Sequence, residues 1–188
     1  MKKIIIKLNY QKVTRIHQRT FADLALRQIW NVVWFLFCKF TPTPFHIWRI
    51  LILKLFGAKI KFNVHIYSSC KIFKPWNLIM DNNSCLGPSV DCYSYDKIFI
   101  GEKSIISQNT FLCTASHDYN SKNFELITAP IIIENNVWVG ANAFVGPGVT
   151  IKNNSVILAC AVVTKNTDEN HVYAGNPARM IKRRLLNL

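Results

Sequence analysis

The stretch IIIENNVWVGANAFVGPGVTIKNNSVILACAVVTK, residues 131–165, repeats an aliphatic residue at every sixth position. A small or aliphatic residue stands two places before each repeat, and Gly or Asn collects in between. Because a helix repeats at about 3.6 residues and an ordinary strand at about 2, a period of six describes a short strand followed by a corner. Three such units close one triangular coil. The stretch therefore predicts a parallel β-helix with these inward residues: Ile133, Val139, Val145, Ile151, Ile157 and Val163.

The same period continues backward from this stretch to Gly57. It gives fifteen six-residue units, and hence an all-β solenoid of about five coils over residues 57–173. Short insertions interrupt the period after positions 72 and 92, and a long one follows position 112. Since each insertion comes after the third unit of a coil, all three are expected to leave at one corner. The longest, residues 117–130, is expected to protrude as a single loop, a common place for binding function.

Positive charge is concentrated at the N-terminal end of the chain. Residues 1–61 contain 12 Lys or Arg and one acid, Asp23, which gives a net charge of +11. Residues 62–188 contain 11 Lys or Arg and nine acids, which gives a net charge of +2. Trp and Phe are frequent in the same basic segment, so a membrane surface is considered as its partner, and no nucleic acid is expected.

Residues 1–56 form a basic and aromatic segment before the solenoid. Its apolar runs over 29–38 and 47–56 are shorter than the roughly 20 residues that cross a bilayer, and a Pro-containing turn at 41–44 separates them. Two short helices are predicted. Two roles stay open: the helices cap the first coil or pack on a neighbouring subunit, or they lie on an anionic membrane surface. A cytoplasmic protein is expected, peripheral on the inner membrane in the second case.

The ends of the chain and its cysteines narrow the protein class. The six cysteines form no C-x-x-C pair, so they predict free thiols in a reducing compartment and no disulfide or zinc framework. The start, MKKIIIKLNYQK, lacks the apolar run of a secretory signal. Residues 174–188 are expected to turn the chain away from the solenoid and to finish as a short basic helix.

Four motifs within the repeats resemble the hexapeptide-repeat O-acetyltransferases. They are IGEKSIISQNTFLCTASHDY (100–119), NVWVGANAFVGPGVTI (136–151), AVVTK (161–165) and AGNPAR (174–179). The upstream stretches PTPFHIWRILILKLFGAKI (42–60) and IYSSCKIFKPWNLIM (66–80) are similar to the branch named for colanic acid biosynthesis. The resemblance implies a left-handed β-helix, a homotrimer with active sites between subunits, and acetyl-CoA as donor without a metal.

His117 is the candidate general base. Acetyl transfer to a hydroxyl needs a base, because an alcohol is a poor nucleophile until its proton is removed, and a neutral imidazole suits this at cytoplasmic pH. Of the five histidines, His117 alone lies where a corner opens into the long insertion. Its context T-A-S-H-D-Y matches the catalytic histidine of the resembled family. Asp118 beside it is a candidate for orienting the ring, shaping the loop or contacting the acceptor.

Donor binding is assigned to the C-terminal coils. By resemblance, the backbone N–H of Ala141 is the candidate donor to the oxyanion of the tetrahedral intermediate. Small side chains at Ala141 and Ala159 suit a thin pantetheine arm, although small residues also fill tight corners. Trp138 is a candidate wall of this site. Three further residues match family positions that meet the adenosine and phosphate end of the coenzyme: Thr164, Lys165 and Arg179.

The acceptor is expected to be a sugar or a lipid-linked sugar of surface or exopolysaccharide assembly. The Asn and Asp that hold sugars in better-known members of the family align with Gly87 and Tyr95 here, so those contacts are not kept. Tyr93, Tyr95 and Asp96 are the candidate replacements, because a Tyr face packs on sugar rings and a carboxylate accepts from hydroxyls. The alternatives are another acceptor, such as serine, an amino sugar or an antibiotic, and a non-catalytic trimeric scaffold. A γ-type carbonic anhydrase is disfavoured, since His117 has no second histidine at suitable spacing.

Overall fold

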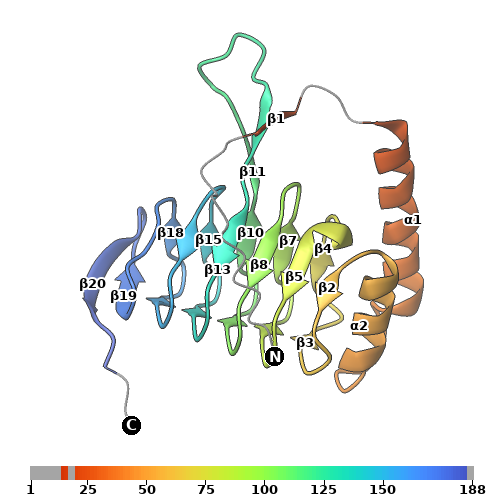
Figure 1. Cartoon of the computed structure of the whole chain (residues 1–188), viewed down its shortest axis with the longest axis horizontal. Coiled ribbons are helices and arrows are strands. Elements are labelled where there is room, and N and C mark those ends of the chain that lie inside the picture. Colours follow the sequence, from red (N-terminus) through yellow and green to blue (C-terminus); the bar gives the residue numbers. More distant parts are fainter. Residues whose placement is uncertain (1–13, 17–19, 186–188) are drawn as a thin grey trace, which may run out of the picture.

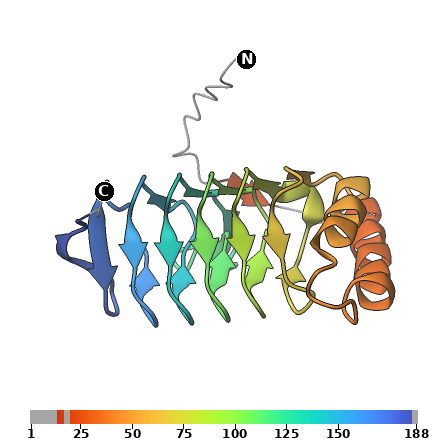
Figure 2. The same ribbon diagram turned by 90° about the horizontal axis from the view of Figure 1, so that it is seen from below.

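A solenoid with short strands on the three faces of a triangular prism makes up most of the chain in a computed structural model, which describes residues 14–16 and 20–185. Figures 1 and 2 show the coils stacked along one axis, with two helices at the N-terminal end and a hairpin at the C-terminal end. Within the coils, the strands of each face pair in parallel, because each strand lies beside the corresponding strand of the next coil. The predicted solenoid is confirmed.

Each sheet takes one strand from every coil. The first sheet contains β2 (Lys59–Ile60), β5 (Leu78–Met80), β8 (Ile98–Ile100), β13 (Ile131–Ile133) and β16 (Thr150–Ile151). The second contains β3 (His65–Ile66), β6 (Cys85–Leu86), β9 (Ile105–Ile106), β14 (Trp138–Val139), β17 (Val156–Ile157), β19 (His171–Ala174) and β20 (Arg179–Arg183). The third contains β4 (Lys71–Ile72), β7 (Asp91–Tyr93), β10 (Phe111–Cys113), β15 (Phe144–Val145) and β18 (Val162–Val163).

The interior of the prism is filled by the residues that set the six-residue period. None of them, from Ile60 in β2 to Val163 in β18, is more than 5% exposed. The corners use left-handed backbone conformations, with φ of 58° at Asn109 and 57° at Asn142, which Asn tolerates better than most side chains. These elements give five complete coils, and β19 adds part of a sixth by pairing with β17.

Two helices precede the solenoid, as predicted, and they lie against its N-terminal end (Figure 1). Helix α1 (Phe21–Phe37) is capped at its N-terminus by Thr20, whose side chain accepts from the backbone N–H of Asp23. Helix α2 (His46–Leu55) follows the turn at 41–44. Trp30 is buried and donates from Nε1 to the carbonyl of Ile72 in β4 at 2.6 Å. The buried guanidinium of Arg49 holds the turn between the helices through the carbonyls of residues 42 and 43. A 3₁₀ turn, Pro75–Asn77, fills the first insertion.

The insertion at residues 117–130 forms an arm that stands away from the solenoid (Figure 1). Its strands β11 (Ala115–His117) and β12 (Leu126–Thr128) pair antiparallel. The N-terminal strand β1 (Thr14–Ile16) pairs antiparallel with the outer side of β12, which gives a three-stranded sheet. One cross-strand row of this sheet is Ile16, Leu126 and His117. The arm is therefore braced by a segment more than a hundred residues earlier in the chain.

The C-terminal helix predicted within residues 174–188 is wrong. Residues Arg179–Arg183 form β20, which pairs antiparallel with β19 after the chain reverses at Gly175, where φ is +94°. The reason is the open edge of β19, whose backbone groups need partners once the solenoid ends, and an antiparallel strand supplies them. At the other end, no helix in the described ranges is long and apolar enough to cross a membrane.

Candidate active site

His117 ends strand β11 and is exposed on the arm. Its ring Nδ1 lies 2.6 Å from the backbone carbonyl oxygen of Phe124, on the opposite side of the hairpin. A carbonyl oxygen only accepts hydrogen bonds, so Nδ1 must carry the proton and donate. In the neutral ring, Nε2 then carries the lone pair. The hairpin thus fixes both the orientation and the tautomer that a general base at Nε2 requires.

The tip of the hairpin is shaped by backbone and side-chain bonds of Asp118. Its N–H donates to the carbonyl of Glu125 at 2.9 Å, and its Oδ1 accepts from the N–H of Asn120 at 3.1 Å. Phe124 adopts φ +46°, an uncommon conformation for a bulky residue, where its carbonyl accepts from His117. Sequence reasoning missed the role of Phe124, because a backbone carbonyl has no side-chain signature. Asp118 shapes the loop, one of the three roles predicted for it.

Tyr93, Tyr95 and Asp96 lie at the corner from which the arm departs. Thr114, next to β11, joins them: its hydroxyl donates to the carbonyl of Tyr93 at 2.8 Å and accepts from the N–H of Asp96 at 2.9 Å. Tyr93 and Asp96 are half-buried, whereas Tyr95 is only 7% exposed and stacks on Phe73 with ring centroids 4.7 Å apart. Within the single chain, Tyr95 therefore supports Tyr93 and has little surface left for a ligand.

The predicted donor residues Ala141 and Ala159 lie at a different corner, between the second and third sheets. They belong to successive coils that approach closely: the N–H of Cys160 donates to the carbonyl of Ala141 at 2.9 Å. A Cβ on Gly140 would lie 2.6 Å from the nitrogen of Ala159, so glycine is required for this approach. Ala141 is half-buried, and Ala159 and Cys160 are exposed. The corner thus presents a shallow track of small side chains.

Trp138 lies beside this track on the outer face of the second sheet. Its indole is 47% exposed, and its Nε1 donates to Ser107 Oγ at 2.9 Å. The bond joins β14 to the corner of the preceding coil and fixes the ring against the sheet. A fixed, half-exposed aromatic ring is suitable as a wall for a ligand lying along the track.

Thr164, Lys165 and Arg179 lie at the C-terminal end of the solenoid. Thr164 and Lys165 follow β18 and are exposed. The turn before Arg179 is held against β18, because the N–H of Ala178 donates to the carbonyl of Val162 at 2.8 Å. Arg179 is exposed, and its guanidinium makes one bond, to the carbonyl of Ala178. The structure thus brings three predicted residues to one end, two of them with exposed cationic side chains suited to phosphate oxygens.

The two halves of the predicted site do not meet within one chain. Ala141 precedes β15 in the third sheet, whereas the arm with His117 leaves at the far end of the neighbouring strand β10. The corners are separated by about five residues of extended chain, which spans up to ~17 Å. A base and an oxyanion donor must approach one reacting carbonyl, so the site predicted from His117 and Ala141 would be incomplete in a single chain.

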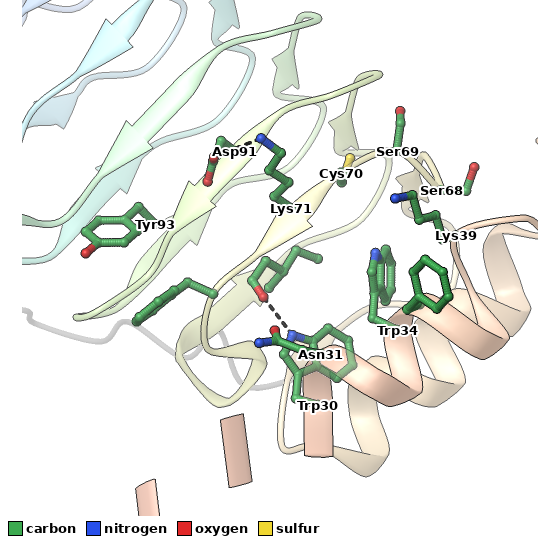
Figure 3. Close-up of a pocket in the computed structure, with 13 residues that line it drawn as sticks. Trp30, Asn31, Trp34, Lys39, Ser68, Ser69, Cys70, Lys71, Asp91 and Tyr93 are labelled. Carbon is green, nitrogen blue, oxygen red and sulfur yellow. Dashed lines mark hydrogen bonds and ion pairs between the residues drawn. The ribbon is translucent and has the colours of Figure 1, made fainter. Parts of the chain in front are cut away.

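A groove that the sequence did not predict lies between α1 and the first two coils (Figure 3). It has a volume of about 490 Å³, and its lining includes Trp34 and Lys39 from the helical end, Lys71 in β4, and Asp91 and Tyr93 in β7. Lys71 Nζ lies 3.9 Å from Asp91 Oδ2. Burial raises the pKa of Asp91, and the nearby ammonium of Lys71 partly opposes this. Helix α1 is brought against these strands by tertiary packing, so no local motif revealed the groove.

The cysteines are free thiols, and most are enclosed by the solenoid or by α1. Burial raises the pKa of Cys38 and of Cys70 to about 12, and it raises the pKa of Cys92 well above its usual value. Cys160, on the track of small side chains, is exposed. Within the part of the chain that the structure describes, no group of three or more His, Cys, Asp or Glu side chains could hold a metal ion.

Comparisons with known proteins agree with this architecture. The sequence family described as "Bacterial transferase hexapeptide (six repeats)" matches residues 130–165. The chain is 40% identical over 158 residues to WcaF of Escherichia coli (strain K12), assigned as an acetyltransferase of colanic acid biosynthesis; the match covers 84% of this chain and 87% of WcaF.

Two solved structures share the fold. A maltose O-acetyltransferase from Clostridium difficile 630 matches with a TM-score of 0.75 and 28% identity, covering 87% of this chain and 88% of that one. A hexapeptide-repeat acetyltransferase of Vibrio cholerae, solved with acetyl-CoA, matches with a TM-score of 0.76 and 24% identity, covering 87% and 90%. Sequence identity over most of both chains, together with the six-residue period, shows that this protein belongs to the hexapeptide-repeat acetyltransferases and has their left-handed parallel β-helix.

Proposed function

We propose that this acetyltransferase moves the acetyl group of acetyl-CoA to a sugar hydroxyl, with His117 as general base. The observation that carries the proposal is the 2.6 Å bond from His117 Nδ1 to the carbonyl of Phe124, which leaves Nε2 free to accept a proton. As the sugar oxygen attacks the thioester carbonyl, Nε2 takes the hydroxyl proton. The tetrahedral intermediate then expels the coenzyme thiolate, which takes that proton from the imidazolium. No covalent acyl-enzyme is formed in this scheme.

The active unit in this proposal is a homotrimer. A contact between one corner of a subunit and a different corner of the next is heterologous, and three such contacts close a ring when the rotation is right. The triangular cross-section supports a ring of this kind. The arm of one subunit, with His117, would then face the track at Ala141 and Ala159 of the next. The Ala141 N–H would be the donor to the oxyanion.

Acetyl-CoA is proposed to lie along the track of small side chains. The pantetheine arm would pass Trp138, Ala141 and Ala159, and the phosphates would meet Lys165 and Arg179, with Thr164 beside them. The cationic groups of Lys165 and Arg179 are exposed and suit phosphate oxygens. The solved structure with acetyl-CoA noted above supports this donor through a shared fold. Because the coenzyme is a cytoplasmic metabolite, we place the reaction in the cytoplasm.

The proposed acceptor is a sugar of a surface or exopolysaccharide precursor. Tyr93 and Asp96 at the departure point of the arm are its proposed contacts, with Tyr95 behind them and Asp118 shaping the loop above. The similarity to WcaF and to a maltose O-acetyltransferase supports a sugar rather than serine or an antibiotic.

A screen of acceptors tests this function. Purified protein and acetyl-CoA are incubated with nucleotide sugars, free oligosaccharides and short-chain lipid-linked saccharides, with serine, an aminoglycoside and chloramphenicol as comparison. Release of free coenzyme thiol, and the mass and ester chemistry of the product, are measured. An O-acetylated saccharide is the expected product. Turnover only with an amine or with serine would contradict the proposal.

A further inference from the structure

Helix α1 exposes an apolar stripe on the side away from the solenoid. Its buried side carries Trp30 and Trp34, whereas Ile29, Val32 and Leu36 are 55%, 58% and 61% exposed. These three residues follow the i, i+3, i+7 spacing that places side chains on one face of a helix. Helix α1 is thus apolar on both sides, although only one side is covered by the coils.

Helix α2 extends this stripe. Ile47, Leu51 and Leu55 recur every four residues and are all exposed. The two helices lie side by side at the same end of the solenoid in Figures 1 and 2, and Trp48 Nε1 joins them by donating to the carbonyl of Phe37 at 2.9 Å. Since the buried sides of both helices face the first coil, their exposed sides face away from it. We call this surface the apolar end face: Ile29, Val32, Leu36, Ile47, Leu51 and Leu55.

The charges around the apolar end face are positive. Asp23 is the only acid in residues 1–61, and its carboxylate is paired with Lys74 Nζ at 2.8 Å. Lys39 and Lys54 lie at the rim, each over an aromatic ring, with Lys54 Nζ 3.6 Å from the centroid of Phe62. A second copy of this face would bring like charges together, so self-association is disfavoured. The pattern complements a partner that is apolar and anionic.

The composition of the rim indicates which apolar and anionic partner fits. Phe40, Phe45 and Trp48 are exposed there beside the lysines. Aromatic rings with basic side chains at the edge of an apolar helix face are typical of helices that lie in the headgroup region of a bilayer. We propose that the apolar end face docks on an anionic membrane surface, and that the acceptor is the saccharide of a lipid-linked precursor in that membrane. The second part rests on the proposed function.

The geometry places the catalytic arm above the membrane and not in it. The arm leaves the third coil. Coils are spaced about 4.8 Å apart and a helix adds about 10 Å, so His117 would lie on the order of 20–25 Å from the membrane surface. A sugar attached directly to a lipid headgroup would not reach this height, but an oligosaccharide on a carrier would. The groove of Figure 3 lies between, where Lys39 and Lys71 suit phosphate, and the half-buried ring of Tyr93 suits a sugar ring.

Co-sedimentation of the full-length chain with vesicles tests the docking. The vesicles are phosphatidylcholine alone or phosphatidylcholine with phosphatidylglycerol, at low and high salt. The wild type is expected to sediment with the anionic vesicles and to be released by salt. The triple variant Ile29→Gln, Val32→Gln, Leu36→Gln should bind at least tenfold more weakly. The matched control is Met180→Gln with Ile181→Gln, which removes exposed apolar side chains at the opposite end of the solenoid and should bind normally.

Three outcomes would overturn the docking: wild-type protein that stays in the supernatant, equal loss in the control variant, or a smaller particle mass of the triple variant in light scattering without lipid. The last would identify the face as an interface between copies of the chain. Two further measurements test the docking and the proposed function independently of each other. His117→Ala should still sediment, and the triple variant should still acetylate a water-soluble saccharide. Vesicle binding without acetylation of any saccharide would refute the proposed function alone.

Discussion

The ring of His117 and the backbone carbonyl of Phe124 face each other across the β11–β12 hairpin, with 2.6 Å between Nδ1 and the oxygen. Many catalytic histidines are oriented by a carboxylate, whereas a neutral carbonyl orients the ring of His117, the proposed general base. The bond fixes the tautomer without placing a full negative charge beside the ring. The orientation of the ring therefore depends on the backbone of the hairpin.

Replacement of His117 by Ala should lower kcat by roughly 10²–10⁴, the usual contribution of a positioned general base. Steady-state kinetics with acetyl-CoA and the acceptor found in the screen measure this, and binding of acetyl-CoA by calorimetry should be unchanged. His171→Ala is the matched control, because that ring also bonds a carbonyl at 2.6 Å but lies in β19. Near-normal turnover of His117→Ala would remove this residue from the mechanism.

Replacement of Arg179 by Ala should raise the KM for acetyl-CoA about tenfold while changing kcat little. The exposed guanidinium is proposed to contact phosphate far from the reacting carbonyl, and such a contact contributes equally to the ground state and the transition state. Lys182→Ala, on the same strand β20, is the control. If the KM for the acceptor rose instead, Arg179 would contact the acceptor, and the proposed direction of the coenzyme along the track would be wrong.

Maleimide labelling at pH 7.5 should modify Cys160 much faster than Cys70 or Cys92. Thiolate is the reactive species; burial raises the pKa of Cys70 to about 12 and keeps Cys92 protonated, whereas Cys160 is exposed. Mass spectrometry of peptides gives the rates. Saturating desulfo-coenzyme A should protect Cys160, because its side chain lies on the proposed track. Labelling at Cys160 that the coenzyme analogue leaves unchanged would exclude this track.

Replacement of Asp91 by Asn should raise the melting temperature at pH 7 and should matter less as the pH falls towards 4. Burial raises the pKa of Asp91 above its unfolded value, so the folded state prefers the protonated carboxyl, and ionisation near neutral pH opposes folding. Scanning calorimetry of both proteins between pH 4 and 7 measures the difference. Lys71→Gln should instead lower the melting temperature at pH 7, because it removes the ammonium that stabilises the ionised carboxylate of Asp91. A lower melting temperature of Asp91→Asn at pH 7 would contradict the argument.

The fold could be predicted because its information is local and repeated. The fifteen inward residues from Ile60 to Val163 are all buried in short strands, and one rule about inward side chains suffices to place them all. The predicted C-terminal helix failed for the opposite reason. Basic residues at 179–184 tolerate either helix or strand, and the open edge of β19, a feature of the assembled solenoid, decided between them.

The candidate site could be proposed from the sequence where a motif pointed to it, and not where backbone or tertiary contacts shape it. The motif and its corner made His117 the candidate base, and its role stays a prediction. The carbonyl of Phe124 that orients the ring, and the burial of Tyr95 behind Tyr93, depend on the folded hairpin and on stacking across coils. The separation of His117 from Ala141 follows from which corner each occupies, which becomes clear only when the strands are assigned to sheets.

The short strand β1 makes the arm depend on the N-terminal part of the chain. Ile16 shares a cross-strand row with Leu126 and His117, so its backbone lies about 10 Å, two strand spacings, from that of His117. Removal of β1 would leave the outer edge of β12 unpaired and reduce the arm to a two-stranded hairpin. Such a hairpin is only marginally stable in water, so the position of the imidazole would depend on a strand that contributes no side chain to the proposed chemistry.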